Sequence, residues 1–340
     1  MHVHVVIVNY GTAALVVECI LTVAAEKLAL TKAPAPQPQS KQGAAGAAER
    51  HHITVAVVDN PKVPPSDNDD ATALSAAIQE HGWQDWVQLC AMPRNGGFAY
   101  GVNAGRQSAS DLDQPPDAFF LLNPDTYIHP GAISELCDYL VAHPEAGMVG
   151  SRLEDPDGTV QHSRFRFPSL ASEFDRGLNL GIVSRLLRRW ATCPPLSETA
   201  HEIDWLSGAA MMIRRDLFDA VGPFDEDYFL YFEELDFARR AHAAGARSHY
   251  VPASRVVHLV GRSTGVTVRD RRPDRTPSYW FASRSRYFKK HHAWLYKRVV
   301  DVAFTIGRCG SHLLRVIRRR PYEGPPHYLW DFVRHNVRPW

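Results

Sequence analysis

Residues 4–11 read HVVIVNYG, an uninterrupted apolar run that stops at an asparagine, a tyrosine and a glycine. Two later stretches have the same form: residues 53–61 read ITVAVVDNP, and residues 118–125 read AFFLLNPD. A short apolar run without alternation, closed by turn-forming residues, is typical of a strand that is buried on both faces. The sequence therefore predicts three buried strands, each followed by polar side chains.

Helical patterns lie among these strands, at residues 13–30, 71–80 and 101–109. Because strands and helices alternate, we predict an α/β fold with a parallel sheet and right-handed crossovers. In such a sheet the ligand site lies at the carboxyl ends of the strands. Tyr10 and Asp59 fall at two of these ends, and Asp125 falls at the third.

The second half of the chain is less regular. Residues 204–215 (DWLSGAAMMIRR) predict a strand that enters a helix, and residues 229–244 (FLYFEELDFARRAHAA) predict a helix that ends near Gly245. Beyond Pro277 the chain becomes basic and aromatic, with helical spacing. Residues 33–48, rich in Pro, Gln, Ala and Gly, predict a low-complexity insert without a catalytic role.

A glycine-rich loop from Arg94 to Asn103 (RNGGFAYGVN) precedes the third helix. Glycines let backbone N–H groups approach a ligand closely at the start of a helix. The carboxylate of Asp59 could accept the imide N–H of a uracil or thymine ring. The loop is not a P-loop, because no GKS or GKT follows it, and not a dinucleotide fingerprint, because it does not follow the first strand. Turn formation and packing alone are the alternative role of these glycines.

Two residues are candidate metal ligands. Asp125, just beyond a buried strand, suits a divalent cation that bridges two phosphates, because hard cations prefer oxygen ligands. The alternative is an ordinary Asn-Pro turn with a helix-capping aspartate. His258 follows a strand-like segment and could ligate a metal or contact a diphosphate. With 17 histidines in the chain, a structural role for His258 is the alternative.

Three acids lie within four residues, at Glu233, Glu234 and Asp236. Their neighbours are apolar, so we expect at least one of these carboxyl groups to be partly buried. Burial raises the pKa of a carboxyl group and prepares it to act as a general base. The alternative is a set of salt bridges with Arg239 and Arg240.

Together and in this order, these clusters resemble family 2 glycosyltransferases with a GT-A fold, especially the bacterial rhamnosyltransferase-like branch. The resemblance runs from Val5 to Gly265 and rests on these motifs: VNY at 8–10, VDN at 58–60, NGGFAYGVN at 95–103, LNPD at 122–125, WLSGA at 205–209, GPFDE at 222–226, YFEELD at 231–236 and HLVGRSTG at 258–265. It implies a mostly parallel, Rossmann-like sheet flanked by helices. We expect a catalytic domain at 1–265, which includes the insert at 33–48, and a basic helical extension at 266–340.

The resemblance also implies a reaction and the residues for it. The reaction is inverting transfer of a sugar, most often L-rhamnose from dTDP-rhamnose, to a hydroxyl of a saccharide or lipid-linked saccharide in cell-surface polysaccharide synthesis. The implied donor-binding residues are Val8, Tyr10, Asp59, Arg94, Asn95, Gly97, Asn103, Asn123 and Asp125. The implied ligands of Mg²⁺ or Mn²⁺ are Asp125 and His258, and the acceptor side is formed by Trp205, Gly208 and Glu233. Glu234 is the implied catalytic base, with Glu233 and Asp236 as alternatives. Where the family has a two-aspartate metal element, this chain reads Asn-Pro-Asp.

Charge is distributed unevenly along the chain. Residues 1–261 hold 20 Lys+Arg against 32 Asp+Glu, whereas residues 262–320 hold 16 against 3. A basic tail with interleaved aromatic residues predicts an interfacial helix on an anionic membrane surface. The residues that suggest it are Trp280, Tyr287, Trp294 and Tyr296 with Lys289, Lys290, Lys297 and Arg298. Packing of the tail on the acidic body is the main alternative. We expect no nucleic-acid partner, because no known nucleic-acid module is present.

Other features bound the location and the competing functions. Five cysteines without paired spacing fit a reducing cytoplasm. The apolar stretch at 3–25 is interrupted by polar residues, so we expect a buried strand, a loop and a helix there in place of a signal peptide or a membrane span. We expect a cytoplasmic enzyme, peripheral on the inner face of the plasma membrane. A sugar nucleotidyltransferase is disfavoured, because residues 9–12 (NYGT) lack the Arg and Lys of its activating loop. A non-catalytic nucleotide-sugar-binding protein of the same fold remains the other alternative.

Overall fold

The computed structural model describes residues 1–32, 51–62, 70–260 and 274–337. The expected insert at 33–48 and the expected domain boundary at residue 265 lie outside these ranges.

Within the described ranges, a central sheet of nine strands organises the fold. Its members are β1 (His2–Asn9), β2 (His52–Asp59), β3 (Val87–Ala91), β4 (Ala118–Leu122), β5 (Thr126–Ile128), β6 (Ala146–Glu154), β8 (His201–Ile203), β10 (Ala210–Arg214) and β11 (Arg247–His258). They run in the order β3-β2-β1-β4-β10-β6-β11-β5, with β8 paired to β11. The strands β3, β2, β1 and β4 pair in parallel, whereas β10 is antiparallel to both β4 and β6. A separate small sheet pairs β7 (Arg164–Phe165) with β9 (Trp205–Leu206).

The helices of the described chain are α1 (Ala13–Lys32), α2 (Asp70–Glu80), α3 (Gly97–Ser108), α4 (Ala132–Ala142), α5 (Leu170–Leu178), α6 (Gly181–Leu186), α7 (Arg215–Val221), α8 (Glu233–Ala243), α9 (Ser278–His291), α10 (Trp294–Ile317) and α11 (Tyr328–Phe332). Three short helical turns are η1 (Ala109–Asp111), η2 (Arg188–Trp190) and η3 (Val333–Val337). None of the described helices is both long and apolar enough to cross a bilayer.

Two hydrophobic cores lie on opposite faces of the sheet, because successive strand residues point to opposite sides. Val3, Val5 and Ile7 of β1 pack with α1, α2 and α4, whereas Val6 and Val8 pack with α3, α7 and α8. The result is a three-layer α/β/α arrangement. The predicted α/β fold class with a parallel, Rossmann-like half is confirmed.

Two predicted helices begin at different residues in the structure. Helix α3 begins at Gly97, four residues before the predicted start, because the side chain of Asn95 accepts the Gly97 N–H and opens the helix there. Helix α8 begins at Glu233, four residues after the predicted start, because Tyr231 and Phe232 have left-handed backbone angles of +69° and +73°. Both corrections fall next to residues of the candidate site.

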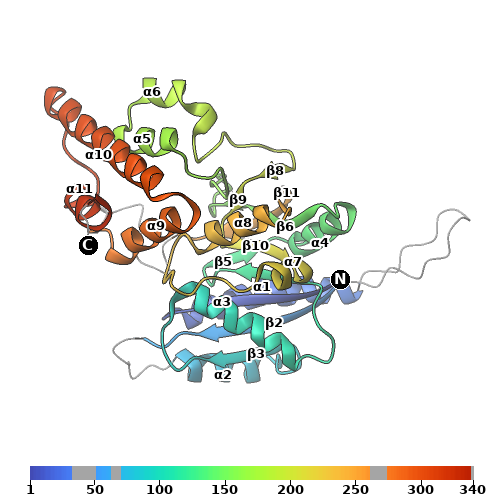
Figure 1. The fold of residues 1–340 in the computed structure, drawn as a ribbon. Coiled ribbons are helices and arrows are strands. Elements are labelled where there is room, and N and C mark those ends of the chain that lie inside the picture. The colour runs from blue at the N-terminus through green and yellow to red at the C-terminus, as the bar shows by residue number, and fades with distance from the viewer. Residues whose placement is uncertain (33–50, 63–69, 261–273, 338–340) are drawn as a thin grey trace, which may run out of the picture.

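The C-terminal helices pack tightly on the rest of the chain. Figure 1 shows α9, α10 and α11 beside α5 and α6 at one end of the molecule, with the β2–β3 edge at the other. Helices α5 and α10 approach closely at two glycines: a Cβ on Gly177 would lie 2.4 Å from the Phe304 carbonyl oxygen. The buried guanidinium of Arg284 donates to Glu173 and Asp301. The basic extension is therefore fixed to the body through internal ion pairs.

Candidate active site

A cavity of about 330 Å³ opens at the carboxyl ends of the parallel strands. It is lined by Val8, Tyr10, Asn60, Asn95, Gly97, Phe98, Asn123, Pro124, Phe229, Leu230 and Tyr279. Five of the residues predicted to bind a donor are among them: Val8, Tyr10, Asn95, Gly97 and Asn123. The strand ends therefore meet where the sequence predicts, and they enclose a partly apolar space.

Beside this cavity, the ends of β1 and β2 are held together by buried polar side chains. The parallel register places Asn9 opposite Asp59, and Asn9 Nδ2 donates to Asp59 Oδ1 at 2.6 Å. The same amide nitrogen donates to Asp70 at the start of α2. Both Asn9 and Asp59 are buried. Asp59 itself does not line the cavity, but Asn60, which follows it in the chain, does.

The glycine-rich loop approaches the acid-bearing segment closely. The Phe98 N–H donates to the carbonyl oxygen of Phe229 at 3.0 Å. Gly97 has a φ of +87°, and a Cβ at this position would lie 1.9 Å from the same carbonyl oxygen. Only glycine fits here, because both the backbone angle and the contact exclude a side chain. The packing role considered for these glycines and the cavity-forming role are therefore both present at Gly97.

Two other residues predicted to bind the donor do not line the cavity. The Arg94 guanidinium lies over the ring of Tyr100, 4.5 Å from its centroid. The Asn103 side chain donates to the Phe224 carbonyl and to Glu226, and it accepts the Phe224 N–H. Asn103 has a structural role here, because its amide fastens the loop before α8 to helix α3.

The cavity also includes aromatic residues that the sequence analysis did not select. Tyr279 of α9 lines it, with its ring centroid 5.4 Å from that of Phe229. Ser283, one turn further along α9, donates to the carbonyl oxygen of Leu230. Phe229 and Leu230 directly precede the acidic motif, so their position in the sequence could have predicted that they lie at the site. Tyr279 carried no local signal, because it follows a basic segment far along the chain.

The two predicted metal ligands, Asp125 and His258, are brought together by antiparallel pairing of β5 and β11, which places His258 opposite Thr126. His258 Nε2 lies 3.6 Å from the carboxylate of the fully buried Asp125. Gln161 donates through Nε2 to the His258 carbonyl, so its Oε1 faces His258 Nδ1 at 3.3 Å and can accept that N–H. The histidine is then oriented with Nε2 toward the aspartate.

One carboxylate and one oriented imidazole fit a divalent cation that takes its other ligands from water and phosphate oxygens. Burial lowers the pKa of His258, and the charge of Asp125 opposes this shift. Within the described ranges, no three His, Cys, Asp or Glu side chains gather closely enough to form a complete metal cage. The pair therefore suits a cation that arrives with a phosphorylated ligand.

The acid pair begins helix α8. Glu233 is buried, Glu234 is half-buried, and the Oε2 atom of each has no hydrogen-bond partner within the described chain. Burial raises the pKa of Glu234 to about 7, although the backbone N–H groups of Glu234 and Gly208 lower it. Burial, together with the charge of Glu234, raises the pKa of Glu233 well above its ordinary value. Both carboxyl groups therefore bind a proton more tightly than an ordinary glutamate does, and Glu234 can take one up near neutral pH.

Asp236 differs from its two neighbours. Its carboxylate accepts hydrogen bonds from His291, Lys290, Arg240 and Tyr228, and it is fully buried. Burial alone would raise the pKa of Asp236, but the hydrogen bonds from His291, Lys290 and Arg240 outweigh it and lower the pKa. The prediction of Asp236 as an alternative base is wrong, because hydrogen-bond donors occupy both carboxylate oxygens. The salt-bridge alternative is correct for this acid and Arg240.

Two of the predicted acceptor residues, Trp205 and Gly208, lie on and just after strand β9. Trp205 stacks on Phe165 across the small β7–β9 sheet, and its indole N–H donates to the Arg166 carbonyl. Gly208 connects the two halves of the site, because its N–H faces Glu234 while its Cα lies against the Phe98 ring of the cavity. The adjacent Ala209 carbonyl accepts the Asn123 N–H. Acid pair and cavity therefore share one backbone segment.

A Rossmann-like parallel half with a cavity at its strand ends, and an acid pair linked to that cavity through the Gly208 segment, are typical of the GT-A fold class. The profile of the family described as "Glycosyltransferase like family 2" matches residues 52–286. The chain therefore belongs to glycosyltransferase family 2.

Individual relatives agree with this assignment. The chain is 30% identical, over 70% of its length and 76% of the relative's, to N-acetylglucosaminyl-diphospho-decaprenol L-rhamnosyltransferase of Mycobacterium tuberculosis. It is 27% identical, over 58% of its length and 72% of the relative's, to rhamnosyltransferase WbbL of Escherichia coli. Among solved structures, a mannosyltransferase of Pyrobaculum calidifontis with GDP-Man and Mn²⁺ superimposes with a TM-score of 0.50 at 14% identity, covering 93% of this chain and 74% of that one. This structural similarity supports the fold.

Proposed function

We propose that the protein transfers L-rhamnose from dTDP-rhamnose, with inversion, to a hydroxyl of a saccharide or lipid-linked saccharide in cell-surface polysaccharide synthesis. The observation that carries the chemistry is the acid pair: Glu234 has a raised pKa and an oxygen without a hydrogen-bond partner in the described chain, beside the backbone that borders the cavity. The rhamnosyltransferase names of the relatives support the choice of sugar.

Glu234 acts in this proposal as the general base. Its carboxylate removes the proton of the acceptor hydroxyl as that oxygen attacks the anomeric carbon from the face opposite the leaving nucleotide. A single displacement of this kind inverts the configuration and needs no covalent intermediate. Glu233, whose pKa burial also raises, contributes a polar contact on the acceptor side rather than a second base. Trp205 and Gly208 border that side.

The donor is bound by the cavity at the strand ends. Tyr10 and Phe98, which line the cavity, offer aromatic faces for the nucleobase and sugar. In this proposal Asp59, next to the lining residue Asn60, accepts the imide N–H of thymine. Asp125 and His258 would hold Mg²⁺ or Mn²⁺ at the diphosphate. When bound, the cation would neutralise the charge that develops on the leaving nucleoside diphosphate.

The setting of the reaction follows from the acceptor. The mycobacterial relative is named for a diphospho-decaprenol acceptor, which is a membrane lipid. We propose that this chain likewise acts on a lipid-linked saccharide, in the cytoplasm at the inner face of the plasma membrane.

A donor screen tests this function. The purified protein is titrated with dTDP-rhamnose, UDP-glucose and GDP-mannose, each with Mn²⁺ and with EDTA, and thermal stabilisation and donor turnover are measured. We expect dTDP-rhamnose to stabilise the protein most and to be turned over, and EDTA to remove both effects. Substituting Asp125→Ala should abolish the metal-dependent part alone. Binding without turnover, with or without an acceptor saccharide, would instead identify a non-catalytic nucleotide-sugar-binding protein.

A further inference from the structure

We propose that the outer faces of α10 and α6 form a surface that docks on an anionic lipid bilayer. The surface, here called the docking face, consists of the apolar side chains of α10 that point away from the body together with those of α6 and η2 that face them. This inference adds a residue-level surface to the proposed membrane setting, and it rests on the proposed function only for that setting. It differs from the interfacial helix that the sequence predicts.

Helix α10 carries apolar side chains on its solvent-exposed face as well as on its buried one. The face that packs on the body mixes the apolar Val300 and Phe304 with Lys297 and Asp301, whose side chains form a buried ion pair. The face that points outward is apolar: Trp294, Leu295, Val299, Val302, Ile306, Leu313, Val316 and Ile317 are all exposed, with Trp294 and Val316 each at 74%. At 100° per residue these eight positions fall within an arc of roughly 140°. One continuous apolar stripe therefore runs the length of the helix.

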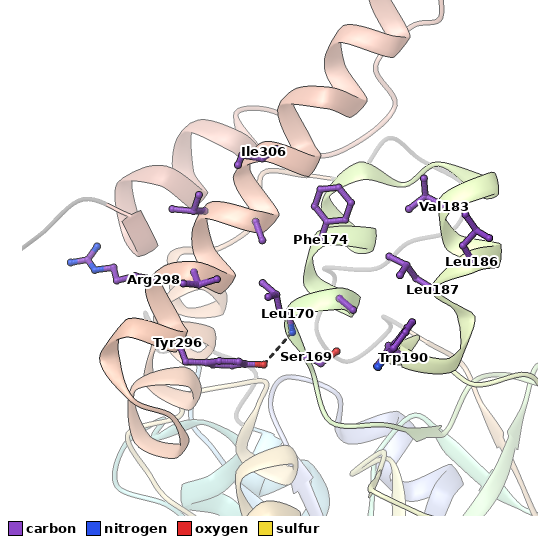
Figure 2. A pocket seen from close by; sticks show the side chains of 14 residues that line it. Ser169, Leu170, Phe174, Val183, Leu186, Leu187, Trp190, Tyr296, Arg298 and Ile306 are labelled. Carbon is purple, nitrogen blue, oxygen red and sulfur yellow. Dashed lines mark hydrogen bonds between the residues drawn. The ribbon is translucent and has the colours of Figure 1, made fainter.

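A groove lies between this stripe and helix α6. Its volume is about 990 Å³, and Figure 2 shows Val183, Leu186, Leu187 and Trp190 on one wall facing Ile306 and its neighbours on the other. The floor is fixed by the Tyr296 hydroxyl, which accepts the Leu170 N–H at 3.1 Å. Ile182 and Leu186 of α6 are 72% and 74% exposed. A water-exposed apolar surface of this extent is unusual on a monomer and indicates a binding partner.

The positive charge around the docking face indicates an anionic partner. Residues 169–190 and 294–320 together contain eleven Lys+Arg and three Asp+Glu. Two of the three acids, Glu173 and Asp301, are buried and pair with Arg284, and the half-buried Asp175 accepts from Ser184. Exposed arginines at 185, 188 and 189 border the α6 wall, and those at 318, 319 and 320 follow the end of α10. Apolar side chains rimmed by arginine match the acyl boundary and the phosphates of an anionic bilayer.

A second copy of the chain fits this face less well. Two copies related by a two-fold axis would bring the same arginines against one another, because Lys and Arg outnumber Asp and Glu eleven to three in these two segments. The 24 residues of α10 extend about 36 Å along one line, so the helix can lie flat in a bilayer interface. We therefore propose the anionic bilayer as the partner of the docking face.

The experiment measures co-sedimentation of the full chain with vesicles, at low salt, without donor or acceptor. Vesicles contain either phosphatidylcholine alone or equal parts of phosphatidylcholine and phosphatidylglycerol. The test variant carries Leu186→Ser, Val302→Ser and Ile306→Ser. The matched control carries Leu21→Ser, Leu28→Ser and Val141→Ser, which are also exposed apolar residues but lie on α1 and α4.

We expect the wild-type chain and the control to bind the anionic vesicles but not the neutral ones, and the test variant to lose at least about tenfold in binding. Both variants should keep the wild-type thermal midpoint and the wild-type transfer rate to a short soluble acceptor. Absence of wild-type binding, or equal binding by the test variant, would overturn the docking face while leaving the transfer activity intact. A wild-type dimer that dissociates in the test variant, with no vesicle binding, would overturn it in favour of a second copy.

Discussion

The donor half and the acid half of the active site are built by different physical means. The donor half rests on the adjacent parallel strands β1, β2 and β4. Pairing of β1 with β2 places Asn9 directly opposite Asp59, and the two side chains are hydrogen-bonded. The acid half rests on side chains far apart in sequence: Asp236 is held by His291 and Lys290 of α9, 55 and 54 residues away. The first half depends on backbone geometry, and the second depends on long-range ion pairs.

The strongest effect is expected where the two halves touch, at Gly97. Substituting Gly97→Ala forces a Cβ against the Phe229 carbonyl and strains a φ of +87°. We expect the free energy of unfolding to fall by roughly 3 kcal/mol or more and donor binding to be lost. Gly82→Ala is the matched control, since Gly82 also has positive φ but nothing lies within 4 Å of a Cβ there. The control should lose only about 1 kcal/mol. Equal losses at the two glycines would show that the two halves are not in contact here.

The anchor of the acid half is tested at Asp236. Asp236→Asn leaves Lys290 and Arg240 without their shared carboxylate in a buried site, so we expect a loss of roughly 3–5 kcal/mol in unfolding free energy. Because the pKa of Asp236 is lowered, its contribution is present at neutral pH and is lost as pH falls below the ordinary aspartate range. Asp219→Asn, in the half-exposed pair with Arg106, should cost less than about 1 kcal/mol in urea unfolding. A comparable cost at both positions would contradict the anchoring role.

The acid half should also respond to pH where the donor half does not. With the pKa of Glu234 raised to about 7, kcat/KM for transfer should fall about tenfold per pH unit below 7, while the donor dissociation constant changes little. The sign for stability is opposite to that of Asp236. A raised carboxyl pKa stabilises the fold at acidic pH, and that contribution is lost as pH rises through about 7. The wild-type thermal midpoint should therefore fall relative to that of Glu234→Gln between pH 5 and 8. A flat rate profile down to pH 5 would remove Glu234 as the base.

The smallest effect is expected at Tyr279, where the C-terminal helices enter the donor half. Tyr279→Ala removes an aromatic wall of the cavity, so donor affinity should fall about fivefold, corresponding to about 1 kcal/mol. Tyr322→Ala, another aromatic of the extension that is not among the cavity residues, is the control for calorimetric titration. Unchanged donor affinity in Tyr279→Ala would mean that the extension contributes only packing.

These contrasts explain how much the sequence could predict. Uninterrupted runs such as residues 4–8 and 118–122 predicted β1 and β4 closely, because a strand buried on both faces leaves a local signature. Val8, Tyr10, Asn95, Gly97 and Asn123, which line the cavity, were predicted as donor-binding residues from the resemblance to family 2 glycosyltransferases. Donor roles for Asp59, Asp125 and His258 stay predictions that the geometry accommodates.

What the sequence could not predict depends on distant partners. Asp236 and Glu234 are both acids beside apolar residues, and only the position of α9 separates a salt-bridged carboxylate from one with a raised pKa. The environment of the basic tail likewise depends on partners that are distant in sequence. Lys290 and Lys297, expected on a membrane surface, form internal ion pairs, and Tyr287 is buried. The apolar face of α10 can be identified as exposed only from the structure, which shows that the face with Lys297 and Asp301 packs on the body.

The most direct test of the account compares Glu234→Gln with Glu233→Gln in two assays on the same preparations: titration with dTDP-rhamnose and Mn²⁺, and transfer to an acceptor saccharide. We predict that Glu234→Gln binds the donor as the wild type does but loses at least about a hundredfold in turnover, whereas Glu233→Gln loses much less. Near-normal turnover in Glu234→Gln, with turnover lost in Glu233→Gln, would contradict the assignment of Glu234 as the residue that accepts the proton.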